Sequence, residues 1–141
     1  MVHAGASGVG TSLIQILKNV LNVDTVYATC GSDAKKRYLE DNLNVSKVFN
    51  YKKAEEENFD ELISELTDKK GVDVVFDCVG GSYWEKNLES LGVDGELILY
   101  GLMGGGSVNG NILAKILRKR IHLKSTTLRA RSVDVNRNLF F

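Results

Sequence analysis

Short apolar segments alternate along this chain of 141 residues with longer segments whose apolar residues recur every three or four positions. The first pattern predicts β-strands and the second predicts amphipathic helices. Strands are expected near residues 1–4, 25–29, 47–50, 72–77, 96–100 and 121–127. Helices are expected near residues 9–21, 32–42, 55–69, 82–91 and 111–119.

The strands in the second half of the chain have the character of a parallel sheet. Residues 72–76 and 97–100 are nearly continuous apolar runs, as expected when helices cover both faces of a sheet. The regular alternation of strand and helix predicts an α/β fold with a doubly wound parallel sheet, the Rossmann dinucleotide-binding fold. No linker or change of composition divides the chain, so a single domain over residues 1–141 is expected.

The first ten residues lead from a strand end through a glycine-rich turn into an amphipathic helix. Backbone N–H groups of such a turn and the positive end of the helix attract a pyrophosphate. The match to the G-x-G-x-x-G pattern is imperfect: Gly5 and Gly10 take the outer places, Ser7 takes the middle one, and Gly8 is added. An ordinary glycine loop is the alternative. The complete order of strand, turn, helix and strand favours dinucleotide binding.

Further glycines follow the predicted strands, at the sheet edge where folds of this class bind ligands. Gly31 follows the second strand, Gly80 and Gly81 follow the fourth, and four glycines within residues 101–106 follow the fifth. Glycine after a strand is also ordinary turn chemistry. The cluster after the fifth strand exceeds that need and predicts backbone lying close to a ligand.

The end of the second strand indicates which dinucleotide is bound. NAD-preferring folds carry an acidic residue there, about twenty residues beyond the glycine turn, and this chain has Cys30. Ser32, Lys35 and Lys36 follow and offer partners for a 2′-phosphate. The sequence therefore predicts NADPH. In the alternative, Ser32 is only a helix N-cap and the lysines are solvated, and Asp33 disfavours phosphate if it points inward.

The net charge of the chain bears on whether it binds nucleic acid or a membrane. Eighteen basic and eighteen acidic side chains cancel, so no net field favours nucleic acid or an anionic membrane. One basic cluster lacks interleaved aromatic residues for base stacking, and we interpret it as a solvated helix face with interface charge. Its members are Lys115, Arg118, Lys119, Arg120, Lys124, Arg129 and Arg131.

Composition also bears on disulfide bonds, metal sites and membrane contact. The two cysteines, Cys30 and Cys78, lack the spacing of a disulfide framework or a zinc site. No segment reaches the roughly 18 apolar residues that span a bilayer, and no signal peptide is evident. A cytoplasmic protein without membrane contact is expected. His3 is expected in the core, and neither a catalytic acid–base pair nor a metal site is assigned.

Five ordered blocks of sequence resemble a known family. They are residues 2–10, 29–32, 49–53, 77–87 and 99–106. Together they resemble the cofactor domain of the NADPH quinone oxidoreductases, in the zinc-free branch of the medium-chain dehydrogenase/reductase superfamily. The resemblance implies transfer of hydride from NADPH to a small-molecule quinone or a related conjugated carbonyl, with the cofactor supplying the hydride chemistry.

The resemblance also implies which residues line the cofactor site. The turn that holds the pyrophosphate is matched by Ser7, Gly8 and Val9. The pocket for the adenosine ribose and its 2′-phosphate is matched by Gly31, Ser32, Lys36 and Tyr51, with Lys36 preferred to Lys35 for its spacing to Leu43. The nicotinamide side is matched by Val79, Gly80, Gly101, Leu102 and Met103.

The same resemblance implies an assembly larger than this chain. Family members carry a barrel-like substrate domain before the cofactor domain and a return segment after it, so we expect an isolated cofactor domain here. Their cofactor domains pair through an edge strand, which predicts a homodimer through residues 121–127. The alternatives are the cofactor domain of a zinc alcohol dehydrogenase or an enoyl reductase of the same superfamily, and a non-enzymatic NADPH-binding module.

Overall fold

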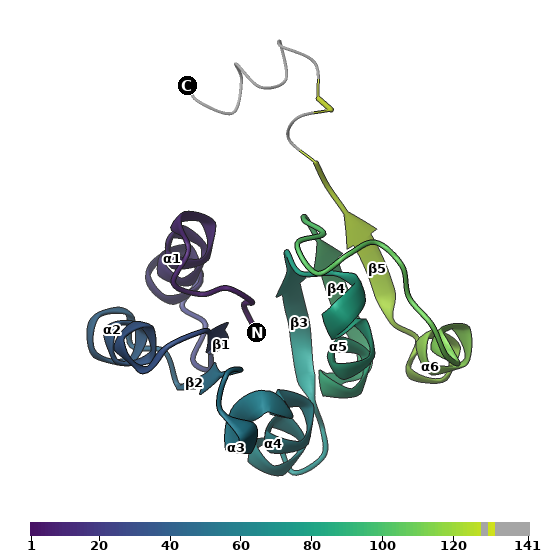
Figure 1. Cartoon of the computed structure of the whole chain (residues 1–141), viewed down its shortest axis with the longest axis horizontal. Coiled ribbons are helices and arrows are strands. Elements are labelled where there is room, and N and C mark those ends of the chain that lie inside the picture. The colour runs from purple at the N-terminus through teal and green to yellow at the C-terminus, as the bar shows by residue number, and fades with distance from the viewer. Residues whose placement is uncertain (128–129, 132–141) are drawn as a thin grey trace.

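The computed structural model describes residues 1–127 and 130–131 (Figure 1). Predictions that fall on residues 128–129 and 132–141, including Arg129 of the basic cluster, lie outside the described residues. The strands are β1 (Tyr27–Cys30), β2 (Lys47–Asn50), β3 (Val72–Asp77), β4 (Leu91–Leu99) and β5 (His122–Ser125). All of their pairings are parallel, in the orders β1-β2 and β3-β4-β5.

A single residue, Val2, joins the two parts of the sheet. It forms parallel bridges to Ala28 in β1 and to Phe76 in β3, which completes the order β2-β1-Val2-β3-β4-β5. The predicted strand over residues 1–4 is therefore wrong in extent, because only Val2 takes part. The chain turns away at Ala4, whose φ of 49° lies in the left-handed region. The strand order reverses beside Val2, and in doubly wound sheets ligands bind at such a switch point.

The helices are α1 (Gly8–Gln15), α2 (Asp33–Leu43), α3 (Ala54–Glu57), α4 (Phe59–Leu66), α5 (Trp84–Ser90) and α6 (Ile112–Lys119). A π-helical turn, η1 (Ile16–Val20), continues α1, and a 3₁₀ turn, η2 (Gly81–Tyr83), precedes α5. The predicted helix over residues 55–69 is divided at Asn58, whose ψ of 61° is not helical. The predicted helix over residues 82–91 ends earlier, because β4 already begins at Leu91.

Helices cover both faces of the sheet, as predicted. One core joins α1 and α2 to the first strands through Ile14, Leu39, Val48 and their neighbours. The other joins α4 and α5 to β3 and β4 through Phe59, Ile63, Val75, Leu88 and Leu97, with α6 packed beside it. Two separate apolar layers of this kind define a doubly wound α/β domain.

The last described strand, β5, pairs only with β4 among the described residues and forms that edge of the sheet. The basic cluster beside it faces acidic side chains. Lys115 contacts Glu85 and Glu89, and Arg120 contacts Asp94 at 2.6 Å. No helix in the described ranges combines the length and apolar character needed to cross a membrane.

Candidate cofactor site

The glycine turn opens at the start of α1. The hydroxyl of Ser7 accepts a hydrogen bond from the N–H of Gly10 at 3.0 Å and so caps the helix. A Cβ at Gly10 would lie 2.4 Å from the carbonyl oxygen of Ala4, so helix and turn pack too closely for a side chain. A Cβ at Gly8 would meet nothing within 4 Å. Packing therefore explains Gly10, whereas the missing side chain at Gly8 leaves open space at the start of the helix for an approaching ligand.

Two neighbouring cavities follow this turn along the carboxyl ends of the strands, and they share Ala4 and Tyr51. The smaller, of about 110 Å³, is lined by Ala4, Ala6, Ser7, Cys30, Gly31, Lys35 and Tyr51. The larger, of about 290 Å³, is lined by Ala4, Thr29, Tyr51, Val79, Ser82, Tyr83, Met103 and Gly104. Tyr51 packs over Gly31, where a Cβ would lie 2.6 Å from its hydroxyl oxygen. The glycine thus makes room for the ring that separates the cavities.

Two ion pairs lie close to Lys35 and Tyr51, which line the smaller cavity. Lys36 forms an ion pair with Glu56 of α3. The carboxylate of Asp33 contacts Lys53 at 3.0 Å and accepts a hydrogen bond from the Asn50 amide at 2.9 Å. Hydrogen bonds from Asn50 and Lys53 lower the pKa of Asp33. The carboxylate of Asp33 is therefore held by Asn50 and Lys53, and Asp33 does not line either cavity.

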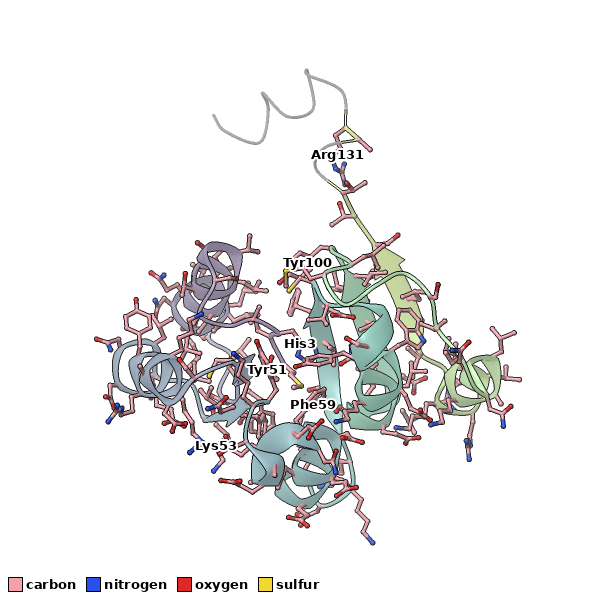
Figure 2. The ribbon with its side chains drawn as sticks, viewed as in Figure 1. His3, Tyr51, Lys53, Phe59, Tyr100 and Arg131 are labelled. Atoms are coloured by element: carbon pink, nitrogen blue, oxygen red, sulfur yellow. The ribbon has the colours of Figure 1, made fainter. Side chains whose placement is uncertain are left out.

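A buried chain of hydrogen bonds lies beneath the larger cavity and begins at His3, which Figure 2 shows in the interior close to Phe59. The Nδ1 atom of His3 lies 3.0 Å from the Thr29 hydroxyl, and its Nε2 atom lies 2.6 Å from the Oδ1 atom of Asn87. The Asn87 amide donates to Asp77 at 3.0 Å. Because Asn87 Oδ1 can only accept, the network assigns the His3 proton to Nε2. Burial lowers the pKa of His3 to about 4, so the imidazole is neutral.

This network ends at the loop after β3. Asp77 is fully buried and accepts hydrogen bonds from the N–H groups of Val79 at 2.7 Å and Gly80 at 3.1 Å. Burial raises its pKa, while these hydrogen bonds act in the opposite direction. The carboxylate thereby fixes the turn that forms one wall of the larger cavity.

The loops after β3 and β4 also hold each other. The N–H of Gly104 donates to the carbonyl of Val79 at 2.6 Å, and the N–H of Gly81 donates to that of Gly105 at 2.7 Å. A Cβ at Gly104 would lie 2.2 Å from the Ser82 hydroxyl oxygen. Contact between the loops is thus a structural reason for these glycines, beside the turn chemistry and the nearby ligand that the sequence pattern suggested.

The structure brings together part of the predicted site. Ser7, Gly31, Tyr51, Val79 and Met103 line the two cavities. Gly8 and Val9 instead face a larger apolar hollow between α1 and strands β3 and β4, and Gly101 and Leu102 line a hollow beside the end of β5. Ser32 caps α2 by accepting from the N–H of Lys35 at 3.4 Å.

The lining also includes residues that the sequence analysis did not select for the site. Lys35 lines the smaller cavity, although its neighbour Lys36 was the preferred match. Tyr83 lines the larger cavity, and its ring centroid lies 4.9 Å from that of His3 and 6.2 Å from that of Tyr51. Tyr83 belongs to block 77–87, which resembles the known family, but it was not selected as a site residue. Cys30, at the position that is acidic in NAD-preferring folds, does line the smaller cavity.

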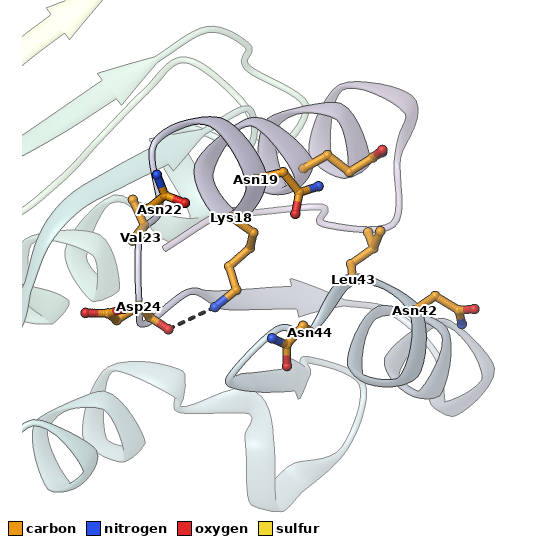
Figure 3. A pocket seen from close by; sticks show the side chains of 9 residues that line it. Lys18, Asn19, Asn22, Val23, Asp24, Asn42, Leu43 and Asn44 are labelled. Carbon is orange, nitrogen blue, oxygen red and sulfur yellow. Dashed lines mark hydrogen bonds between the residues drawn. The ribbon is translucent and has the colours of Figure 1, made fainter.

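A further polar pocket, of about 490 Å³, lies at the opposite ends of β1 and β2 (Figure 3). Its lining includes Asn19, Asn22, Asn42 and Asn44, and Lys18 donates to the carbonyl of Asp24 at 2.9 Å. It is separated from the glycine turn by the length of the strands, so it does not belong to the cofactor site. No group of side chains in the described part of the chain is suited to hold a metal ion.

Comparison with known proteins places this geometry in a family. A family profile described as "Zinc-binding dehydrogenase" matches residues 8–138. The chain belongs to this family. It has the Rossmann fold of the cofactor domain in the medium-chain dehydrogenase/reductase superfamily, as the sequence resemblance predicted.

Individual relatives agree with this assignment. A protein named "Probable quinone oxidoreductase" from Leishmania amazonensis is 36% identical over 101 residues, which cover 72% of this chain and 28% of the relative. The structure of the Escherichia coli quinone oxidoreductase complexed with NADPH superimposes with a TM-score of 0.77 at 27% identity, over 99% of this chain and 43% of that one. The CurK enoyl reductase superimposes with a TM-score of 0.71 at 25% identity, over 91% and 36%. The chain spans between 5% and 32% of the length of the first three curated relatives.

Proposed function

We propose that this chain binds NADPH as the cofactor domain of a reductase that transfers hydride to a quinone or a related conjugated carbonyl. The observation that carries the proposal is the pair of cavities on either side of Tyr51, at the switch point of the sheet. A dinucleotide has two halves joined by a pyrophosphate, and the glycine turn reaches this row of cavities at Ser7, next to the open space at Gly8.

The surroundings of the smaller cavity support NADPH over NADH. Cys30 is neutral where an acidic residue would hold the ribose hydroxyls, and the carboxylate of Asp33 is engaged by Asn50 and Lys53. Lys35 lines the cavity, and Lys36 lies in the next position of the same helix. We assign Ser32, Lys36 and Tyr51 to the ribose and its 2′-phosphate.

The larger cavity suits the nicotinamide. Its lining combines Val79 and Met103 with the backbone of Gly104, and the buried network from Thr29 to Asp77 supports it from below. We assign Val79, Gly80 and the loop of Gly101, Leu102 and Met103 to this half. Met103 is 72% exposed, so the acceptor would meet an open apolar surface.

Titration calorimetry of the 141-residue chain with each cofactor tests the proposal. A charge-assisted contact to phosphate contributes about 1.5 to 3 kcal/mol, so NADPH is expected to bind at least about tenfold more tightly than NADH. Equal dissociation constants would contradict the preference, and the absence of binding to either cofactor would contradict the assignment of the site.

Two features concern the acceptor and the assembly. The match to an enoyl reductase, at nearly the same TM-score as the quinone oxidoreductase, supports a conjugated enoyl substrate as the second candidate. Strand β5 is exposed and, within residues 1–127 and 130–131, pairs with no strand other than β4, which supports a homodimer formed through residues 121–127. Sedimentation that reports a monomer at every micromolar concentration would contradict the dimer.

A further inference from the structure

The ion pair between Lys36 and Glu56 is unlike the other ion pair beside the smaller cavity. The side chains of Lys36 and Glu56 are 19% and 14% exposed, whereas those of Lys53 and Asp33 are 40% and 53% exposed. An ammonium group that has lost most of its water requires an anion close by. In this structure, Glu56 supplies that anion.

Glu56 is also held in place from its other side. Its Oε2 atom accepts a hydrogen bond from the N–H of Asn50 at 2.6 Å, while its Oε1 atom contacts Lys36. Burial alone would raise the pKa of Glu56, but the hydrogen bonds from Lys36 and Asn50 lower it below its usual value. The group is therefore a carboxylate at neutral pH.

The pair lies next to the cavity assigned to the 2′-phosphate. Asn50 immediately precedes Tyr51, which lines that cavity. Burial raises the pKa of the Cys30 thiol, which also lines it, and Lys36 and Glu56 act on that thiol in opposite directions. An anion at Cys30 and Tyr51 therefore experiences the charges of both Lys36 and Glu56.

We propose that Glu56 is an internal substitute for the 2′-phosphate of NADPH, and that NADPH binds by taking Lys36 from this carboxylate. This inference rests on the proposed function and adds a residue that determines cofactor specificity. A cofactor without the 2′-phosphate has no group to exchange for Glu56. The carboxylate thus weakens NADPH binding selectively, both by holding Lys36 and by repelling the phosphate.

The first test compares Glu56→Gln with Glu55→Gln. The amide in Glu56→Gln can still accept from Asn50 but carries no charge, whereas Glu55 is exposed on the same helix and forms no ion pair among the described residues. Glu56→Gln should lower the NADPH dissociation constant about fivefold, the size of one partly buried charge interaction, and leave that of NADH unchanged. Glu55→Gln should change neither.

Two results of this comparison would overturn the inference. Weaker NADPH binding by Glu56→Gln would mean that the carboxylate positions Lys36 for the phosphate. Equal effects of the two substitutions would mean that NADPH responds only to net charge. If the unsubstituted chain binds neither cofactor, the proposed function fails instead.

A second measurement uses the unsubstituted chain, so it does not depend on whether a variant folds. In the chain labelled with ¹³C at glutamate carboxyls, the Glu56 signal is followed against pH without cofactor, with NADPH and with NADH. Lys36 and Lys53 are the cations that act on this carboxylate. If the phosphate takes Lys36 from Glu56, the pKa of Glu56 should be higher in the sample with NADPH than in the free chain, and unchanged in the sample with NADH. The same titration midpoint in all three samples would overturn the inference.

Discussion

The two ends of the candidate site use opposite chemistry. At the end of β1, Lys36, Glu56, Asp33 and Lys53 form ion pairs that keep some contact with solvent. At the end of β3, Asp77 is fully buried and its hydrogen-bond donors are all neutral. Partly exposed ion pairs exchange partners at low cost, whereas a buried carboxylate that loses a donor has no water to replace it.

This difference matches what each half of a nicotinamide dinucleotide demands. The adenosine half differs between NADPH and NADH by one charged group, so recognition there depends on charge. The nicotinamide half is the same in both and must be positioned for transfer of hydride, so rigidity matters more. We expect substitutions at the end of β3 to affect stability, and substitutions at the end of β1 to affect selectivity.

The largest effect is expected from Asn87→Leu. The substitution keeps the approximate size but removes one of the donors to buried Asp77 and leaves the Nε2 proton of His3 without its acceptor. Leaving buried polar groups unpaired should lower the free energy of unfolding by about 3 to 4 kcal/mol, measured by urea denaturation. Asn42→Leu, on the exposed side of α2, is the control and should change it little. Equal losses in the two variants would contradict a special role of the network.

The second prediction concerns pH. Burial lowers the pKa of His3 from 6.5 to about 4, so between these values the unfolded chain binds a proton that the folded chain does not. Stability should therefore be full above about pH 6.5 and fall toward pH 4, by on the order of 3 kcal/mol from this group. Urea denaturation at several pH values measures the slope.

Other groups contribute to that slope, so a variant isolates His3. Burial lowers the pKa of the Met1 amine to about 5, which adds a loss of stability as the pH falls. The raised pKa of Asp77 acts oppositely, because its folded form takes up a proton at higher pH than its unfolded form. In His3→Gln the slope between pH 6.5 and 4 should be shallower. An unchanged slope would show that His3 does not titrate on unfolding.

The third prediction separates two glycines of the same turn. Gly10→Ala places a methyl group 2.4 Å from the Ala4 carbonyl oxygen and should cost about 2 kcal/mol of stability. Gly8→Ala has open space and should leave the melting temperature almost unchanged while weakening binding of both cofactors, because the methyl group obstructs the phosphate. If Gly8→Ala binds both cofactors normally, the pyrophosphate does not approach there.

These examples show what the sequence could and could not reveal. The short apolar segments predicted all five described strands, and the spacing from Gly10 pointed to Cys30, which lines the smaller cavity. Local pattern did not reveal that the first strand contributes only Val2, because that depends on the left-handed backbone at Ala4. The partner of Lys36 was also hidden, since Glu56 lies twenty residues further along the chain.

The directions in which neighbouring side chains point could not be predicted from the sequence either. Lys35 and Lys36 are adjacent on α2, yet only Lys35 lines the smaller cavity while Lys36 contacts Glu56. Whether Asp33 would oppose a phosphate depended on Asn50 and Lys53, which reach it from the end of β2 and the segment that follows. Such orientations are set by tertiary packing and not by the local spacing of residues.

The smallest effect is expected at the charged end of the site. Lys36→Ala should weaken NADPH binding about tenfold, or about 1.4 kcal/mol, because one charge-assisted contact to the phosphate is lost. NADH binding and the free energy of unfolding should change much less, since an ion pair of this kind contributes about 1 kcal/mol or less to stability. Lys47→Ala, at the opposite end of β2, removes an exposed positive charge and is the control. Lys35→Ala decides between the two neighbouring cations: a loss of NADPH selectivity in Lys35→Ala but not in Lys36→Ala would move the phosphate contact to the lysine that lines the cavity.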